Sequence, residues 1–123
     1  MKKAISPRTH GVLDYATAAT AAAAAELFRF SQPAARTARG WAAGYGILSA
    51  LTDYPLGVRR ALPFRAHGAL DFAMAPLIPA LPWLLGFARD RRARNFFLGL
   101  AAISAIVTAF TDWKTQPSEH AAY

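Results

Sequence analysis

The chain carries the octapeptide RTHGVLDY at residues 8–15 and a close copy of it, RAHGALDF, at residues 65–72. Arg, His, Gly, Leu and Asp are identical in the two copies. A second pair of related segments follows, because SALTDY at 49–54 resembles TAFTDW at 108–113. The two pairs are offset by 57 and 59 residues. Two matches in nearly the same register predict one duplicated helical hairpin.

The apolar residues are concentrated in four blocks. Of the 123 residues 54% are hydrophobic and 17% are charged, which excludes a disordered chain. Four membrane helices of about 20 residues each would leave room only for connections. The sequence therefore predicts an all-α fold, a four-helix transmembrane bundle made of two parallel helical-hairpin repeats. The blocks cover residues 9–28, 40–56, 66–87 and 95–113.

We expect a single domain in which the two hairpins run the same way and both termini lie on one side of the membrane. Aromatic residues at both ends of the blocks, with arginines outside them, are typical of a membrane interface. The alternative is an up-and-down bundle in water with well-buried, Ala-rich helices. Prolines at 76, 79 and 82 predict a kink in the third helix. The predicted units are the domain 1–123, repeat 1 at about 8–57, repeat 2 at about 65–114, and a polar tail at 115–123.

The charge pattern favours a lipid bilayer as partner and argues against nucleic acid. The net charge is +7, but the basic residues form short clusters between apolar blocks rather than one face or arm. Seven basic residues flank each side of the predicted bundle, so the positive-inside rule assigns no orientation. Arg outnumbers Lys 11 to 3, which suggests a bacterial chain. We therefore predict a multi-pass protein of the bacterial inner membrane. The absence of cysteine excludes thiolate chemistry.

A layer of polar side chains is predicted near the terminal side of the bundle. In each octapeptide the His and the Asp are four residues apart, which places them on one face of a helix. The returning helices bring Thr-Asp pairs to the same level. Arg8 and Arg65 lie just outside as possible salt-bridge partners. The candidate polar or ion-binding residues are His10, Asp14, Thr52, Asp53, His67, Asp71, Thr111 and Asp112.

Four interpretations of this layer are open. It is a structural network, in which Asp53 and Asp112 pair with the two arginines or accept hydrogen bonds from the histidines. It is a path for protons or ions. It binds a divalent metal, although the spacing is not that of a dedicated zinc motif. Its two histidines ligate a haem iron. We favour the structural network, and so expect no metal, no cofactor and no catalytic residue.

The second hairpin resembles a known family. It contains LPWLLGF at residues 81–87, followed by RNFFLG at 94–99. This pattern is similar to the SPW-repeat family of small bacterial integral membrane proteins, which has a Ser-Pro-Trp triplet, a Gly-Phe pair and a polar turn with Asn. Leu81 stands where the family has Ser, and the first hairpin lacks the Pro-Trp pair. The resemblance implies a multi-pass membrane protein and supplies no catalytic residues.

The sequence thus predicts a small four-helix integral membrane protein without enzymatic activity. Its expected role is that of a membrane scaffold or interaction module, with self-association into a homo-oligomer. An alternative is a small ion or proton channel or carrier that uses the His/Asp layer. A further alternative is an intramembrane metal-dependent enzyme. The substrate or partner is not specified by any motif in the chain.

Overall fold

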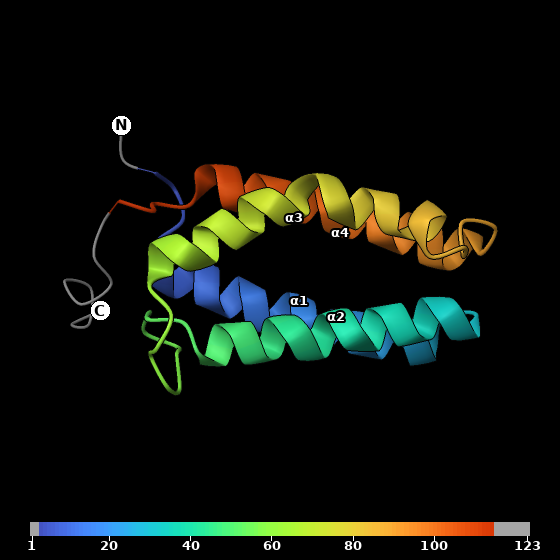
Figure 1. Cartoon of the computed structure of the whole chain (residues 1–123), viewed down its shortest axis with the longest axis horizontal. Coiled ribbons are helices and arrows are strands. Elements are labelled where there is room, and N and C mark those ends of the chain that lie inside the picture. Colours follow the sequence, from blue (N-terminus) through green and yellow to red (C-terminus); the bar gives the residue numbers. More distant parts are fainter. Residues whose placement is uncertain (1–2, 115–123) are drawn as a thin grey trace.

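The computed structural model describes residues 3–114, which form four helices in two antiparallel hairpins (Figure 1). Helices α1 and α2 form the first hairpin, and α3 and α4 form the second. The described residues contain no strand, only two isolated β-bridges. The all-α, four-helix prediction is confirmed, whereas the predicted polar tail at 115–123 lies outside the described residues. The helices are α1 (Pro7–Leu27), α2 (Gln32–Ala50), α3 (Phe64–Leu84) and α4 (Arg91–Phe110).

Local sequence signals mark the helix starts. The Ser6 hydroxyl accepts a hydrogen bond from the Thr9 backbone N–H at 3.2 Å, and a proline opens the first turn of α1. Asp90 caps α4 through Ala93 and also accepts the Ser31 backbone N–H at 2.7 Å. Partial burial acts to raise the pKa of Asp90, but these backbone hydrogen bonds outweigh it and lower that pKa. Asp90 therefore stays ionised and ties the loops of the two hairpins together.

Helix α2 differs most from the prediction. It begins at Gln32 rather than near residue 40, and it ends at Ala50 rather than near 56. The early start follows from amphipathicity, because Arg36 and Arg39 are exposed while Ala34, Ala35 and Ala38 are buried. A count of uninterrupted apolar residues omits these eight residues, about two turns of polar-faced helix.

Helix α3 continues through its three prolines and bends visibly along its length (Figure 1). Each proline removes a backbone N–H donor, and its ring crowds the preceding turn. Proline therefore bends a helix at the point where it stands. The predicted kink is confirmed as a bend within a continuous helix.

The apolar core lies in the half of the bundle away from the described chain ends. Small residues dominate it on α1 and α2, so the helix backbones approach closely. Phenylalanines from the α3–α4 hairpin fill the space opposite, and Phe97 is fully buried. The core includes Ala21, Ala24, Phe30, Ala34, Ala38, Ile78, Phe87, Phe97 and Leu100.

Large apolar side chains also cover the outside of the bundle. Residues such as Ile47, Phe72, Trp83 and Ile106 are more than half exposed. Within residues 3–114, however, α4 is the one helix long and apolar enough to cross a membrane by length and composition. The prediction of four membrane-spanning helices is therefore not supported for α1, α2 or α3 on this criterion. Charged and polar residues in α1, basic residues in the first turns of α2 and the prolines of α3 lower the mean hydropathy of these helices.

The first and last described segments meet at one end of the bundle. Ile5 pairs with the end of α4, donating to the Phe110 carbonyl at 3.1 Å and accepting from the Asp112 N–H at 2.9 Å. Leu62 pairs in the same way with the end of α2, through Leu51 and Asp53 at 2.8 and 2.7 Å. The stretch before each odd-numbered helix thus pairs with the stretch after an even-numbered one. These two bridges frame the polar layer.

Candidate functional site

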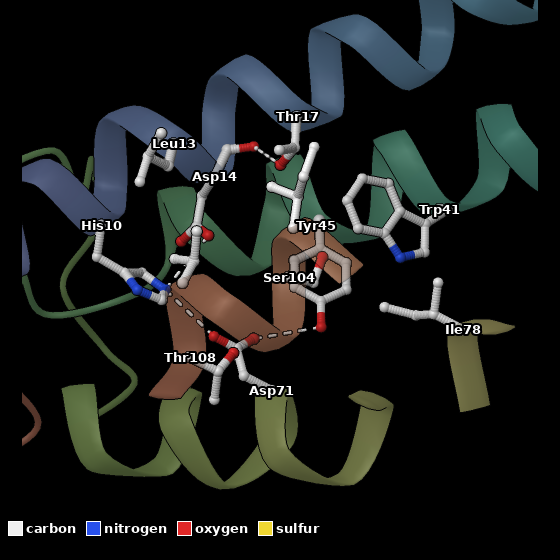
Figure 2. Close-up of a pocket in the computed structure, with 12 residues that line it drawn as sticks. His10, Leu13, Asp14, Thr17, Trp41, Tyr45, Asp71, Ile78, Ser104 and Thr108 are labelled. Carbon is white, nitrogen blue, oxygen red and sulfur yellow. Dashed lines mark hydrogen bonds and ion pairs between the residues drawn. The ribbon is translucent and has the colours of Figure 1, made fainter. Parts of the chain in front are cut away.

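Four buried titratable side chains meet between α1 and α3. His10 and Asp14 come from α1, and His67 and Asp71 come from α3. Each His-Asp pair is one turn apart, so both side chains face the opposite helix, as Figure 2 shows for three of the four. The histidines are 1% and 0% exposed, and the aspartates 7% and 9%. One ligand atom from each residue can be chosen so that all four lie within 4.8 Å of one another.

Each histidine Nε2 stands close to both carboxylates. His10 Nε2 lies 3.3 Å from Asp14 Oδ1 and 3.1 Å from Asp71 Oδ2. His67 Nε2 lies 3.2 Å from Asp14 Oδ2 and 3.4 Å from Asp71 Oδ2. Despite these distances, neither Nε2 makes a hydrogen bond within the described chain. The distances from each Nε2 to the carboxylate oxygens are those of an ion pair, but the direction of the Nε2–H bond is not that of a hydrogen bond.

The other ring nitrogen of each histidine is held by a threonine from the opposite hairpin. His10 Nδ1 lies 2.8 Å from Thr111 Oγ1, and His67 Nδ1 lies 2.8 Å from Thr52 Oγ1. Each threonine hydroxyl donates its own proton to a helix carbonyl at 2.6 Å, that of Val107 or that of Leu48. The hydroxyl oxygen must therefore accept from Nδ1–H. In the neutral imidazole this arrangement leaves the lone pair on Nε2, toward the carboxylates.

Two tyrosines hold the carboxylates. Tyr54 donates to Asp14 Oδ2 at 3.1 Å, and Tyr45 donates to Asp71 Oδ1 at 3.2 Å. Burial raises the pKa of the Tyr54 hydroxyl above its usual value, so it remains a donor. Every member of the four-residue cluster therefore has an outer partner that fixes its orientation.

We expect Thr52→Val to weaken the binding of any metal ion that the lone pair of His67 Nε2 coordinates. Valine has nearly the shape of threonine but cannot accept the Nδ1 proton, so the ring loses its fixed tautomer. Loss of such an outer partner typically lowers metal affinity by about 10–100-fold. Cobalt(II) titration followed by visible absorption measures the change. Thr20→Val is the matched control, because the exposed Thr20 hydroxyl also donates to a helix carbonyl but lies on the outside of α1. Equal cobalt affinity in both variants would contradict this role.

A glycine beside each histidine admits an aromatic ring. A Cβ on Gly11 would lie 3.0 Å from the Tyr54 ring, and a Cβ on Gly68 would lie 2.7 Å from the Trp113 ring. Trp113 also packs edge-on against His10, with ring centroids 4.8 Å apart. Close approach of the aromatic rings to the helix backbones thus walls the cluster off from the terminal side.

We expect Gly68→Ala to destabilise the fold by about 1–3 kcal/mol, the usual cost of overpacking. The new methyl group would overlap the rigid Trp113 ring, which has to move. Gly99→Ala is the control, since a Cβ there meets nothing within 4 Å in the exposed face of α4. That substitution should stabilise the helix by about 0.5–1 kcal/mol. Denaturant unfolding followed by circular dichroism measures both, and equal stabilities would contradict the packing argument.

The structure brings together six of the eight residues predicted for the polar layer. Asp53 and Asp112 lie one residue beyond the threonines and take part in the β-bridges through their backbone amides. The Asp112 carboxylate also accepts the Lys114 backbone N–H at 3.1 Å. The histidines contact the threonines and the other two aspartates, not the carboxylates of Asp53 and Asp112 as one form of the structural-network hypothesis expected. Arg8 and Arg65 have exposed side chains.

Sequence reasoning missed the two tyrosines as part of the site. In the sequence Tyr54 is one of the aromatic residues at the ends of the apolar blocks, and it closes the SALTDY segment at 49–54. That position was the available signal. Tyr45 carries no such signal, because the residue at the matching position of the second hairpin, 59 residues on, is Ser104. Its contact with Asp71 crosses from one hairpin to the other and depends on how the hairpins pack.

Comparison with known proteins adds no family to this description. No protein-family model, no curated protein and no solved structure matches the chain. The resemblance to the SPW-repeat family stays a prediction. The function is therefore argued from the residues of the site.

Proposed function

We propose that the protein binds one divalent first-row transition metal ion between α1 and α3. The ligands are Nε2 of His10 and His67 and one carboxylate oxygen each of Asp14 and Asp71. The observation that carries the proposal is the pair of buried Nε2 atoms, which face two carboxylates yet have no hydrogen-bond partner in residues 3–114. Imidazole nitrogens and carboxylate oxygens are ligands that zinc, cobalt, iron and manganese accept.

The dimensions of the cluster suit such an ion. The four separations between a histidine Nε2 and a carboxylate oxygen are 3.1–3.4 Å. Bonds of about 2.0–2.2 Å from zinc to imidazole nitrogen and carboxylate oxygen place tetrahedral ligand atoms roughly 3.3–3.6 Å apart. One ligand atom from each of the four residues lies within 4.8 Å of the others, so the widest pair would have to close by about 1 Å around an ion. The two carboxylates also balance the charge of a divalent cation, which a buried site requires.

The outer partners are those of a metal site. A metal-ligating histidine usually donates its second ring N–H to a fixed acceptor, and ligating carboxylates are themselves hydrogen-bonded. Here Thr52 and Thr111 accept from the histidines, while Tyr45 and Tyr54 donate to the aspartates. Under this proposal, these contacts would hold all four ligands around a common centre.

A purely structural ion-pair network is the competing explanation. In that case both histidines would be protonated, and each Nε2–H would donate to a carboxylate. Such N–H···O⁻ bonds are short and well aligned when they stabilise a buried pair. The Nε2 contacts reach 3.1–3.4 Å without that alignment. A cation between the four residues would account for the orientation of the imidazole rings. Protons would compete with this cation at low pH, because the ligand atoms must be unprotonated to bind it.

The test is the metal stoichiometry of the whole chain. We expect the purified protein, stripped with a chelator and then dialysed against zinc or cobalt(II), to retain one equivalent per chain. Elemental analysis measures the retained metal, and the visible spectrum of the cobalt form reports nitrogen and oxygen ligands. Asp53→Asn is the control, because this carboxylate stands near the cluster but outside it. Substoichiometric metal in the wild type, or equal loss in the control, would refute the proposal.

We also propose that the bundle is inserted in a membrane, with its helices crossing as two hairpins. The support is the belt of large apolar side chains exposed on all four helices, which water would penalise. In each octapeptide the arginine is exposed, whereas the histidine and the aspartate are buried in the cluster. The ionisable groups that would lie inside the membrane are therefore shielded from lipid. Partition of the expressed protein into the detergent-soluble membrane fraction is expected. Recovery in the aqueous fraction without detergent would refute insertion.

A bound ion would make the protein a metal-clasped membrane scaffold. Every ligand of α1 faces a ligand of α3, so the ion would join the two hairpins. The equivalent contacts of His10 with Thr111 and of His67 with Thr52 support the predicted duplication, since each half supplies the same parts. The proposed role is therefore still that of a scaffold, and a bound metal ion would hold its two hairpins together. Channel and enzyme roles stay predictions of the sequence.

A further inference from the structure

A small cavity opens beside the cluster, between the two hairpins (Figure 2). Its volume is about 30 Å³, enough for one or two water molecules. One wall consists of His10, Asp14 and Asp71, and the remaining lining comes from all four helices. The cavity therefore touches three of the four proposed metal ligands. The rest of the lining includes Trp41, Tyr45, Ile78, Ile103, Ser104 and Thr108.

The lining contains a buried hydrogen-bond donor without a partner. Trp41 is 9% exposed, and its Nε1–H has no acceptor among the residues that the structure describes. The indole stacks on the Tyr45 ring at 4.6 Å, which holds it in place in the cavity wall. Figure 2 shows its nitrogen on the edge of the ring toward Ile78, another lining residue. Buried donors are nearly always satisfied by protein or by a bound molecule.

The cavity coincides with a difference between the two halves of the chain. Tyr45 on α2 is matched, 59 residues on, by Ser104 on α4, and both line the cavity. On the side of α2 the large ring of Tyr45 lines the cavity. On the side of α4 the much smaller side chain of Ser104 leaves open the space that a tyrosine would fill. A purely structural fastener in a duplicated bundle has no need for this difference.

We propose that this cavity holds a small ligand coordinated to the metal: an oxygen- or nitrogen-donor of one to three atoms that also accepts a hydrogen bond from Trp41 Nε1. The inference rests on the proposed metal site. Four protein ligands would fill the tetrahedral shell of a zinc-type ion, so the small ligand would take a fifth position, an expansion that zinc sites sometimes show. Water occupies the position at rest, and a small anion can replace it.

Azide is a suitable probe, because it has three atoms, donates to metals and accepts hydrogen bonds. We expect azide to shift the visible spectrum of the cobalt-loaded, detergent-solubilised wild type in a saturable way. Trp41→Phe keeps the aromatic stack but removes the donor. This substitution should lower the affinity for azide by about 10-fold, as expected for the loss of a hydrogen bond to a charged acceptor. It should leave the affinity for cobalt unchanged.

Ser104→Leu provides the second arm, because its side chain would fill the cavity while all four proposed metal ligands stay in place. We expect it to retain one cobalt per chain and to lose the azide response. One bound cobalt with no azide response in the wild type would overturn this inference alone. An azide response unchanged in Ser104→Leu would also overturn it. Failure of the wild type to bind cobalt would overturn the metal proposal and this inference together.

Discussion

The double variant His10→Ala/His67→Ala is expected to bind no metal, and either single variant to bind at least ~100-fold more weakly than the wild type. Outer partners alone usually account for 10–100-fold in affinity, and a direct ligand contributes more. The loss follows from charge as well as geometry, since two carboxylates without their imidazoles hold an ion less specifically. Cobalt titration with a competing chelator measures the affinities.

The same variants distinguish a metal ligand from a structural histidine through unfolding. Free metal at 100 times its dissociation constant should stabilise the wild type by about 2.7 kcal/mol. In His67→Ala this metal-dependent gain should vanish, whatever the stability of the metal-free variant. If the alanine variants do not fold, Asp71→Asn keeps the volume and the Tyr45 contact and provides the same comparison. A full metal-dependent gain in any of these variants would count against the site.

Phe97→Ala is expected to destabilise the fold by about 3–5 kcal/mol, the range for truncating a buried aromatic. Phe97 is fully buried and packs on the rings of Phe87 and Phe96, with centroids 5.4 and 5.6 Å away. Alanine would leave a cavity that the surrounding small residues cannot fill. Denaturant unfolding in detergent measures the change.

This variant should keep the metal site. The phenylalanine cluster belongs to the core near the helix ends that the 28–31 and 85–90 loops join, whereas the four ligands stand near the opposite ends. At denaturant concentrations where Phe97→Ala is folded, it should still bind one metal per chain. Phe110→Ala is the control, because that ring is 53% exposed and should change stability by less than about 1 kcal/mol. Equal effects of the two substitutions would contradict the assigned core.

Several features of the fold were accessible from the sequence. Apolar blocks and the duplicated octapeptides predicted four helices in two hairpins, and the His-x-x-x-Asp spacing predicted that each pair shares a face. Helix α2 shows where this reasoning fails. Its first turns carry Arg36 and Arg39, so only their position on an outward face, which depends on packing, makes that segment helical.

The candidate site was also accessible only in part. Asp53 and Asp112 have the same residue type and level as the cluster aspartates, and no local pattern separates them. Their separation depends on the β-bridges at Leu62 and Ile5, which turn those backbones away after the threonines. Tyr45 was missed for the same reason, since its partner stands on the other hairpin.

By itself, the sequence determined which residues could share one helix face, because a 3.6-residue period places positions i and i+4 together in any fold. Because two similar octapeptides occur, the sequence also determined that two such faces exist. Only the tertiary structure decided that the two faces meet. It also decided which ring nitrogen of each histidine lies next to the carboxylates. The physical reason is that each histidine is oriented by a threonine from the other hairpin, and each aspartate by a tyrosine distant in sequence. Three of these four contacts cross between the hairpins and form only when both are packed, and the fourth joins Asp14 to Tyr54, 40 residues away, so no local pattern encodes them.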